Sequence, residues 1–331
     1  MSPRTFHDAR VVETTDVATG IRRVVLETPA GARRRADPGT HLDVRVEVPG
    51  GRPEIRSYSV VDSTPDGSRL ALTVHLSPTS RGGSAYVHGL RPGDRLRCTG
   101  PLQNFPVRIG AQRYLLLAGG VGITALAAAA RTLTRLGADV ELVYAGRSRD
   151  RMPYLDDLQA ELGDRVRPAV SAEGGRLDVD ALVARTAREA PGTEAYVCGP
   201  LGLLDAVTHA WRRHAMPPTA LRYETFGSSG RHSAQRFRVQ LPALGLDAVV
   251  EPGSTVLEAL QRQGADPMYD CLKGECGLCV LPVRAVEGLA DHRDVFLSQE
   301  QQEAGNALCV CVSRVAAGPE GREPLLVLDL P

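Results

Sequence analysis

The feature that most constrains this chain is a run of cysteines near its C-terminus. Cys271, Cys276 and Cys279 stand in the segment CLKGECGLC with the spacing C-x4-C-x2-C, and Cys309 and Cys311 follow later in the chain. Thiolates with this spacing converge from one tight loop, and the two glycines in that loop let backbone amides turn toward the sulfurs. The spacing is typical of a plant-type 2Fe–2S cluster, and it predicts an iron–sulfur domain here.

The spacing of the cysteines leaves two questions about this site open. A structural zinc site is the alternative, but zinc usually takes two CxxC pairs, whereas the distal pair here is CVC. The fourth iron ligand is either Cys309 or Cys311, because both point to the same face of a strand. Distance from Cys279 alone fits Cys309 slightly better.

Composition excludes several classes of protein. The 331 residues hold 39 basic and 39 acidic side chains, and this balance argues against nucleic-acid binding. The first residues lack the apolar run of a signal peptide, and the longest apolar stretch, 114–130, is too short and too glycine-rich to cross a membrane. We therefore expect no membrane contact and a cytoplasmic location, where seven cysteines serve as metal ligands or redox groups. Only one basic residue is lysine, Lys273.

Hydrophobic periodicity changes twice along the chain and divides it into parts. Short alternating segments with frequent Gly and Pro predict an antiparallel β-barrel at the start, and strands that alternate with helices then predict an α/β domain with a parallel sheet. A Gly- and Ser-rich segment precedes the cysteine-bearing part. The predicted divisions are a barrel over 1–108, an α/β domain over 109–226, a linker over 227–235 and an iron–sulfur domain over 236–331.

Two tetrapeptides in the barrel suggest a phosphate-bearing aromatic ligand. RSYS (56–59) ends a predicted strand, and RGGS (81–84) follows. An arginine beside a tyrosine and a hydroxyl can bind a phosphate, stack on a ring and hydrogen-bond a ring nitrogen. RGGS can form a nest of backbone amides that opens a helix and suits a phosphate. Either segment alone could be an ordinary strand edge or turn.

One segment of the α/β domain suggests a nucleotide site. AGGVGITAL (118–126) follows a predicted strand and opens a helix, so its glycines lie where a backbone can approach a pyrophosphate. YVCGP (196–200) also ends a predicted strand, with a Cys-Gly-Pro turn. GRSRDRMPY (146–154) follows another strand, and YETF (223–226) ends the domain. The alternatives are tight packing for the glycines, a buried core thiol for Cys198 and a core position for Phe226.

In the order of these motifs the whole chain resembles phthalate dioxygenase reductase and its relatives in the ferredoxin–NADP reductase superfamily. The last ligand in that family precedes Val-Ser-Arg, as Cys311 does in CVSR, and an ADHRD stretch occurs here at 290–294. The resemblance implies a flavin-binding antiparallel β-barrel, a parallel-sheet nucleotide domain and a C-terminal β-grasp ferredoxin domain. It also implies four metal ligands: Cys271, Cys276, Cys279 and Cys311.

The resemblance implies a role for each segment in cofactor binding. Arg56 and Arg81 would contact the flavin phosphate, Tyr58 would lie against the ring system, and Ser59 would sit near its reactive nitrogen. FMN is expected rather than FAD, because this branch of the superfamily uses FMN. The implied flavin-binding residues are Arg56, Ser57, Tyr58, Ser59, Arg81, Gly82, Gly83 and Ser84.

For the nucleotide, the resemblance implies NADH, although an arginine after the second strand would also suit a 2′-phosphate. Cys198 would lie beside the nicotinamide, and Phe226 would shield the flavin ring. Ser59, Cys198 and Phe226 are therefore the expected catalytic residues. The implied nucleotide-site residues are Gly119, Gly120, Gly122, Thr124, Arg147, Cys198, Gly199, Pro200 and Phe226.

The implied function is an NADH-dependent reductase that passes electrons through FMN and a 2Fe–2S cluster to a separate terminal oxygenase. A flavin is needed between NADH and the cluster, because a hydride carries two electrons whereas the cluster accepts one at a time. The family usually serves Rieske non-haem iron oxygenases that act on aromatic compounds. A haem-thiolate monooxygenase is an alternative partner, and an FAD-containing ferredoxin-type reductase is an alternative enzyme. A non-catalytic carrier or zinc-binding module is a hypothesis of another class.

Overall fold

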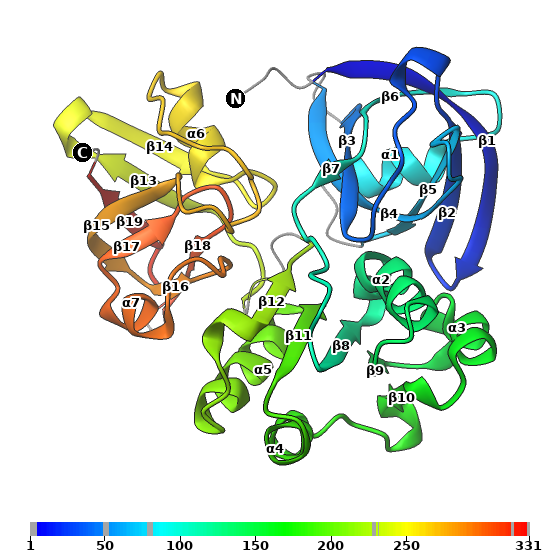
Figure 1. Cartoon of the computed structure of the whole chain (residues 1–331). Coiled ribbons are helices and arrows are strands. Elements are labelled where there is room, and N and C mark those ends of the chain that lie inside the picture. Colours follow the sequence, from blue (N-terminus) through cyan, green and yellow to red (C-terminus); the bar gives the residue numbers. More distant parts are fainter. Residues whose placement is uncertain are drawn as a thin grey trace. The chain divides into compact units, whose positions relative to one another are not determined.

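The first part of the computed structural model is a closed antiparallel barrel (Figure 1). The model describes residues 5–48, 53–77, 82–226, 230, 232–318 and 321–329. The sheet runs in the order β4-β5-β2-β1-β6-β3, and β3 pairs with β4 to close it. Closure leaves few exposed strand edges. The six strands are β1 (Phe6–Ala18), β2 (Ile21–Glu27), β3 (Thr40–Val46), β4 (Glu54–Ser63), β5 (Arg69–His75) and β6 (Arg95–Thr99).

Alternation along these strands fills the barrel with aliphatic side chains. Leu42, Val44 and Val46 of β3 are fully buried in one hydrophobic cluster, because every second residue of a strand points to the same face. The short helix α1 (Gly83–Gly89) contacts β3 and β5, and the short strand β7 (Leu102–Gln103) pairs with β3.

A five-stranded parallel sheet follows the barrel. Its order is β10-β9-β8-β11-β12, so the chain first runs outward from β8 and then returns to its other side at β11. The carboxyl ends of β8 and β11 are therefore neighbours, which is the place where such sheets bind nucleotides. The strands are β8 (Arg113–Gly119), β9 (Val140–Gly146), β10 (Val166–Val170), β11 (Thr193–Cys198) and β12 (Leu221–Glu224).

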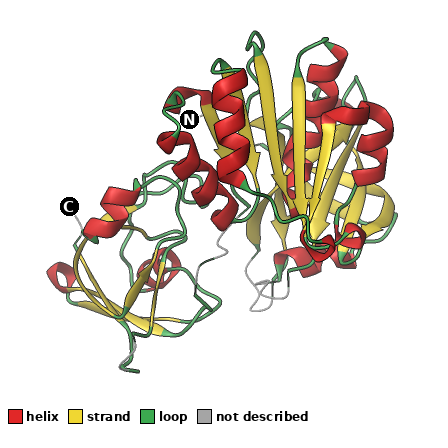
Figure 2. Ribbon diagram, turned by 90° about the horizontal axis from the view of Figure 1, so that it is seen from below, coloured by secondary structure: helices red, strands yellow, loops and turns green. Residues whose placement is uncertain are grey.

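Four helices accompany this sheet, and Figure 2 shows them packed alongside its strands. Helix α2 contacts α3, and α4 contacts α5. Helix α2 is rich in alanine, and this small side chain lets it pack closely against β8, β9 and the barrel strand β4. The helices are α2 (Ile123–Arg135), α3 (Leu155–Leu162), α4 (Val179–Glu189) and α5 (Leu201–Arg213).

The barrel and the parallel sheet share one hydrophobic core. Val25, Val61 and Ala71 of the barrel belong to the same buried cluster as Leu116 of β8 and Leu126 of α2. By contact density the chain divides into only two compact units, Met1–Glu224 and Thr225–Pro331. The expected boundary between 108 and 109 therefore lies inside the first unit, and the four expected divisions stay predictions.

The second unit is a mixed sheet with one helix packed on it. Strands β13 and β19 pair in parallel, whereas the other pairs are antiparallel. Helix α6 (Val256–Arg262) begins with a capping box made by Thr255 and Glu258, and it buries its apolar face in the core. The sheet strands are β13 (Phe237–Leu241), β14 (Leu246–Val250), β15 (Val280–Glu287), β17 (Ala307–Cys309) and β19 (Leu325–Leu328).

Three smaller elements complete this unit around the cysteine loop. Strands β16 (Leu289–Asp291) and β18 (Arg314–Ala316) form an antiparallel pair, and helix α7 (Gln299–Ala304) has a capping box at Ser298 and Gln301. The expected fold class is confirmed, with an antiparallel barrel, a parallel α/β sheet and a ferredoxin-type domain. In the part of the chain that the structure describes, no helix is both long and apolar enough to cross a membrane.

Candidate functional site

The RSYS segment lies on β4 opposite polar residues of β3. Ser57 pairs with Asp43 and Ser59 with His41 across the two strands, so these four side chains share one face. The Ser57 hydroxyl donates a 2.6 Å hydrogen bond to Asp43 Oδ1. Tyr58 points to the other face and packs against the barrel core, and burial raises the pKa of its phenol to about 12.

Ser59 is the least satisfied polar residue of this segment. Its side chain is only 6% exposed, and among the described residues its Oγ has no hydrogen-bond partner. Buried hydroxyls in folded proteins almost always have a partner, so this atom marks a place that suits a polar ligand atom. A flavin ring nitrogen or oxygen meets that requirement.

Arg56 lies against the second predicted segment. A Cβ built on Gly83 would sit 3.0 Å from Arg56 Cγ, so the side chain crosses directly over the start of α1. Gly82 has φ 103°, a left-handed conformation that favours glycine, and the Ser84 hydroxyl accepts a 3.2 Å hydrogen bond from the Ser77 amide. Arg56 also forms an ion pair with Glu54. The structure thus brings an arginine and a glycine turn together, a combination that suits a phosphate.

Arg81, the remaining member of the predicted phosphate site, lies outside the described residues. Its place in the sequence directly precedes the turn at Gly82.

The two glycine turns of the parallel sheet are packed back to back. A Cβ on Gly122 would lie 2.1 Å from the Cys198 carbonyl oxygen, and one on Gly119 would lie 2.7 Å from Pro200 Cδ. Cys198 itself is fully buried at the end of β11, in register with Ala118 of β8. Only glycine leaves room for the two turns to touch each other. The turns therefore form one continuous backbone surface at the edge of the sheet.

Two further members of the predicted nucleotide site complete the first turn. Gly120 has φ 55° and opens a 3-10 turn that leads into α2. The Thr124 hydroxyl is buried and donates a 2.9 Å hydrogen bond to the Val121 carbonyl, which closes that turn from inside the helix. Backbone amides at this position can face a pyrophosphate.

The loop after β9 carries exposed arginines. Arg147 is exposed, whereas Arg149 donates two hydrogen bonds, of 2.9 and 3.3 Å, to the carboxylate of Glu173. Glu173 follows β10, the next strand of the sheet. Sequence reasoning missed Glu173. Its place directly after a strand that neighbours β9 was the available signal.

The YETF segment is partly buried and partly exposed. Phe226 is 41% exposed, whereas Glu224 and Thr225 are buried. Glu224 is in register with Cys198 across β12 and β11.

The cysteine loop folds back on its own sulfurs. The amides of Lys273 and Glu275 each donate to Cys271 Sγ at 3.4 Å. Gly274 has φ 74°, and a Cβ there would lie 2.6 Å from the Val312 side chain. Only glycine therefore fits at this position of the loop. Amide hydrogen bonds to sulfur stabilise thiolates and orient cluster ligands.

Cys311 contacts both Cys271 and Cys279, whereas the partner of Cys309 among the predicted ligands is Cys279. The Cys311 Sγ is 3.1 Å from Cys279 Sγ, and it also hydrogen-bonds Cys271. The contact with Cys311 and the amides lower the pKa of Cys271 to about 4, and hydrogen bonds with Cys309 and Cys311 lower that of Cys279 to about 3. Cys309 is buried between Cys279 and Asp294. The ligand set itself stays a prediction.

Cys276, the remaining predicted ligand in the loop, is exposed. Within the described ranges, no three ligating side chains gather around one point as a single metal ion would require. A 2Fe–2S cluster has a different demand, because four thiolates are shared between two irons. Soft sulfur donors in a glycine-bearing loop fit that group.

The ADHRD stretch forms a buried polar frame behind the loop. Asp291 accepts a 2.7 Å hydrogen bond from the Arg293 guanidinium, and the Ser313 hydroxyl donates to Asp294 Oδ1 at 2.9 Å. Asp294 also accepts from the Leu297 amide at 2.9 Å. A Cβ on Gly274 would lie 2.8 Å from Asp294 Cα, so this frame supports the cysteine loop directly.

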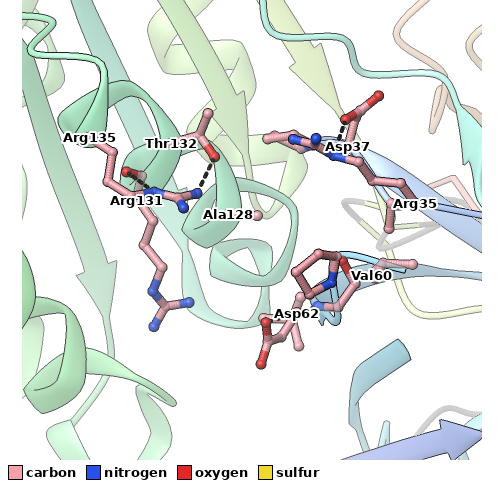
Figure 3. Close-up of a pocket in the computed structure, with 13 residues that line it drawn as sticks. Arg35, Asp37, Val60, Asp62, Ala128, Arg131, Thr132 and Arg135 are labelled. Carbon is pink, nitrogen blue, oxygen red and sulfur yellow. Dashed lines mark hydrogen bonds and ion pairs between the residues drawn. The ribbon is translucent and has the colours of Figure 1, made fainter. Parts of the chain in front are cut away.

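A surface cavity of about 370 Å³ lies elsewhere, between the end of β4 and the outer half of α2 (Figure 3). Arg131, Thr132 and Arg135 of α2 line one side, and Arg35 and Asp37 line another. Arg131 is paired with Glu161, and Arg35 with Asp37. None of the predicted flavin or nucleotide residues lines it. This cavity lies where the barrel meets helix α2, and the charges of its side chains are largely compensated by ion pairs.

Two family models match the chain in the expected order. Residues 8–106 match the oxidoreductase FAD-binding domain, and residues 244–316 match the 2Fe-2S iron-sulfur cluster binding domain. The chain is 34% identical over 328 residues to the heme-dependent oxidative N-demethylase beta subunit of Ectopseudomonas mendocina (strain ymp), which covers 98% of this chain and 99% of that one. It is 35% identical over 301 residues to the toluene-4-sulfonate monooxygenase system reductase subunit TsaB1 of Comamonas testosteroni, with 89% of each covered.

Solved structures agree with these matches. Phthalate dioxygenase reductase superposes with a TM-score of 0.74 at 27% identity and covers 98% of both chains. An intact type IV self-sufficient cytochrome P450 monooxygenase superposes with a TM-score of 0.66 at 33% identity, but this chain spans only 41% of that protein.

The fold, the two domain matches and the cysteine loop define an electron-transferring oxidoreductase with a flavin-binding domain and a 2Fe–2S domain in one chain. The chain belongs to the family of phthalate dioxygenase reductase, and the expected resemblance is confirmed.

Proposed function

We propose that this protein oxidises NADH and delivers the electrons one at a time to a separate terminal oxygenase. The observation that carries the proposal is a single chain that joins the flavin-type barrel to the cysteine loop. When bound, a flavin supplies two-electron chemistry toward the nicotinamide and one-electron chemistry toward the cluster. The residues of this chain bind, orient and shield these groups.

FMN is the proposed flavin. Arg56 and the turn at Gly82–Ser84 supply one compact phosphate site, which is what FMN requires. Arg81 is proposed to add a second guanidinium, and Ser57 and Tyr58 to hold the ring system. The buried hydroxyl of Ser59 is proposed to form a hydrogen bond with the flavin ring.

NADH is the proposed electron donor. The backbone surface formed by Gly119, Gly122 and the Cys198–Pro200 turn suits a pyrophosphate and nicotinamide. Arg149, which could attract a 2′-phosphate, is held instead by the Glu173 carboxylate. A carboxylate at this position disfavours the extra phosphate of NADPH electrostatically. Arg147 is then left to contact the adenosine side, and Phe226 to shield the flavin.

The proposed cluster ligands are Cys271, Cys276, Cys279 and Cys311. The contact of Cys311 with Cys271 as well as Cys279 favours it over Cys309, whose partner in this set is Cys279. None of the seven cysteines, all of which lie in the described residues, forms a disulfide, which suits a reducing compartment, and we therefore propose a cytoplasmic location.

The proposed partner is a Rieske non-haem iron oxygenase that acts on an aromatic compound. The likeness to phthalate dioxygenase reductase and to the toluene-4-sulfonate monooxygenase reductase subunit supports it. A haem-thiolate monooxygenase is the second candidate, favoured by the likeness to part of a self-sufficient cytochrome P450.

The test is an anaerobic visible spectrum of the purified protein, recorded before and after stoichiometric NADH and, in parallel, NADPH. We expect NADH to bleach both the flavin band and the broad iron–sulfur absorption. Acid extraction and mass measurement of the released flavin then separate FMN from FAD. A protein that contains zinc, or whose spectrum NADH leaves unchanged, would contradict the proposal.

A further inference from the structure

Glu275 lies inside the cysteine loop, yet its carboxylate is engaged outside that loop. Its Oε1 accepts two hydrogen bonds from Thr225, one from the backbone amide and one from the hydroxyl, both at 3.1 Å. Thr225 is only 2% exposed. The two residues are fifty positions apart in the sequence, so this contact arises only from tertiary folding.

A carboxylate at this position requires a compensating interaction. Four thiolates converge on the loop, and a further negative charge beside them is electrostatically unfavourable. The positive charge of Lys273 and the two hydrogen bonds from Thr225 act against this repulsion, since hydrogen bonds to an ionised acceptor are the strong ones. The carboxylate is therefore held to one partner rather than left to solvent.

Both ends of this contact lead to residues of the proposed electron route. Thr225 is bonded to Phe226, the proposed shield of the flavin. Glu275 is bonded to Cys276, and its amide donates to Cys271 Sγ at 3.4 Å. Two hydrogen bonds thus connect the residue next to Phe226 with the residue next to Cys276.

We propose that Glu275 is a positioning residue for electron transfer within the chain, because it fastens the segment that carries Phe226 to the loop that carries Cys271 and Cys276. The inference rests on the proposed function. In the step concerned, one electron leaves the NADH-reduced flavin, and one ferric ion of the cluster becomes ferrous.

Four variants separate the tether from the charge. Glu275→Ala removes both hydrogen bonds, whereas Glu275→Gln removes the charge but keeps an oxygen that can accept them. Thr225→Val removes the hydroxyl donor and keeps the amide. Thr225→Ser keeps both donors and is the matched control. Iron content and the visible spectrum first establish that each variant holds its cluster.

The first measurement is hydrogen–deuterium exchange at the Thr225 amide, followed in peptides of the full-length protein. Loss of a hydrogen bond to a charged acceptor should speed this exchange about tenfold in Glu275→Ala. Glu275→Gln and Thr225→Ser should exchange like the unmodified protein. Unchanged exchange in Glu275→Ala would overturn the inference without reference to activity.

The second measurement is anaerobic stopped-flow with NADH, which resolves flavin reduction from cluster reduction. We expect the cluster phase to slow about tenfold in Glu275→Ala, less in Thr225→Val and not in Thr225→Ser, while the flavin phase keeps its rate. An unchanged cluster phase in both Glu275→Ala and Thr225→Val overturns the inference. If NADH reduces neither centre in the unmodified protein, it is the proposed function that fails. If Glu275→Ala loses its cluster, Glu275→Gln and Thr225→Val carry the test.

Discussion

At the scale of single residues, the barrel contains two buried hydroxyls without partners among the described residues, those of Ser59 and Thr28. Both hydroxyls are buried and unsatisfied, but only Ser59 lies on β4, the strand that carries RSYS. An unsatisfied hydroxyl in a core costs stability, and the proposed contact with the flavin ring would explain its presence at Ser59. Thr28 has no such explanation here.

Replacing Ser59 with alanine should slow hydride transfer from NADH to the flavin by about a hundredfold, the usual effect of removing one positioned hydrogen-bond partner. Flavin content should stay the same, because the phosphate contacts remain. Stopped-flow absorbance at the flavin band measures the rate. Thr28→Val is the matched control and should react like the unmodified protein. Equal rates for Ser59→Ala and the control would contradict the prediction.

The distal cysteines also separate at this scale. Alternation in the sequence left Cys309 and Cys311 equivalent, whereas the folded chain places only the Cys311 sulfur at 3.1 Å from Cys279 and in contact with Cys271. Cys309 lies between Cys279 and Asp294.

Substitution of Cys311 with alanine should abolish the iron–sulfur spectrum, and the same change at Cys309 should preserve it, because only Cys311 meets both other thiols. Iron and acid-labile sulfide content, together with visible absorption, measure the outcome. The two variants are controls for each other. A cluster lost on Cys309→Ala and kept on Cys311→Ala would reverse the assignment.

At the scale of elements, much of the α/β part could be predicted from the sequence. The apolar strand and alanine-rich helix after residue 112 appear as β8 and α2. Helix α3 begins only at Leu155, because Tyr154 before it adopts φ 63° and cannot belong to it. Contacts between distant segments, such as Arg149 with Glu173 and Thr225 with Glu275, could not be predicted. They depend on how strands and loops meet in three dimensions.

Strand β9 contains a buried carboxylate that joins three elements. Glu141 accepts hydrogen bonds from Arg113, Arg167 and Arg185 at 3.0, 2.7 and 2.6 Å. Burial acts to raise the pKa of Glu141, but the hydrogen bonds from Arg185 and Arg167 outweigh it, and the pKa is lowered. A lowered pKa in the folded state means that this charge stabilises the fold above the unfolded pKa.

Glu141→Gln should therefore lower the free energy of unfolding by about 2 kcal/mol at pH 7. The difference from the unmodified protein should shrink as the pH falls below the ordinary glutamate pKa of about 4.3 and through the lowered value of the folded state. Urea unfolding of both proteins across this range measures it. Glu161→Gln, which breaks an exposed pair with Arg131, should cost less than about 0.5 kcal/mol. A deficit that stays constant with pH would contradict the assigned role.

At the scale of the whole molecule, the hydrophobic cores follow the two compact units. One core is made of residues from Phe237 onward, and the others end no later than Cys198. The barrel is not separate from the parallel sheet, since its residues Val25, Val61 and Ala71 belong to a hydrophobic cluster that also contains residues of that sheet. The functional divisions of this chain and its folding units are therefore different.

A chain ended after Phe226 should fold, bind flavin and reduce ferricyanide with NADH at a rate within about threefold of the full protein, because every buried cluster of the first unit is kept. A chain ended after residue 108 should be far less stable, because its share of the common core becomes exposed. Thermal unfolding and the ferricyanide assay measure both fragments. A stable flavin-binding 1–108 fragment would contradict the shared-core interpretation.

Lys273 is the only lysine in this chain, and its amide lies against a sulfur of the cysteine loop. An amine-reactive fluorophore therefore has only two targets, the α-amino group and the Lys273 side chain. Blocking the α-amino group first, at a pH near its ordinary pKa of about 8, directs the fluorophore to Lys273 in a second step. The protein thus contains a natural attachment point for a distance probe beside its iron–sulfur site. Energy transfer from that point would report the approach of an oxygenase without any engineered residue.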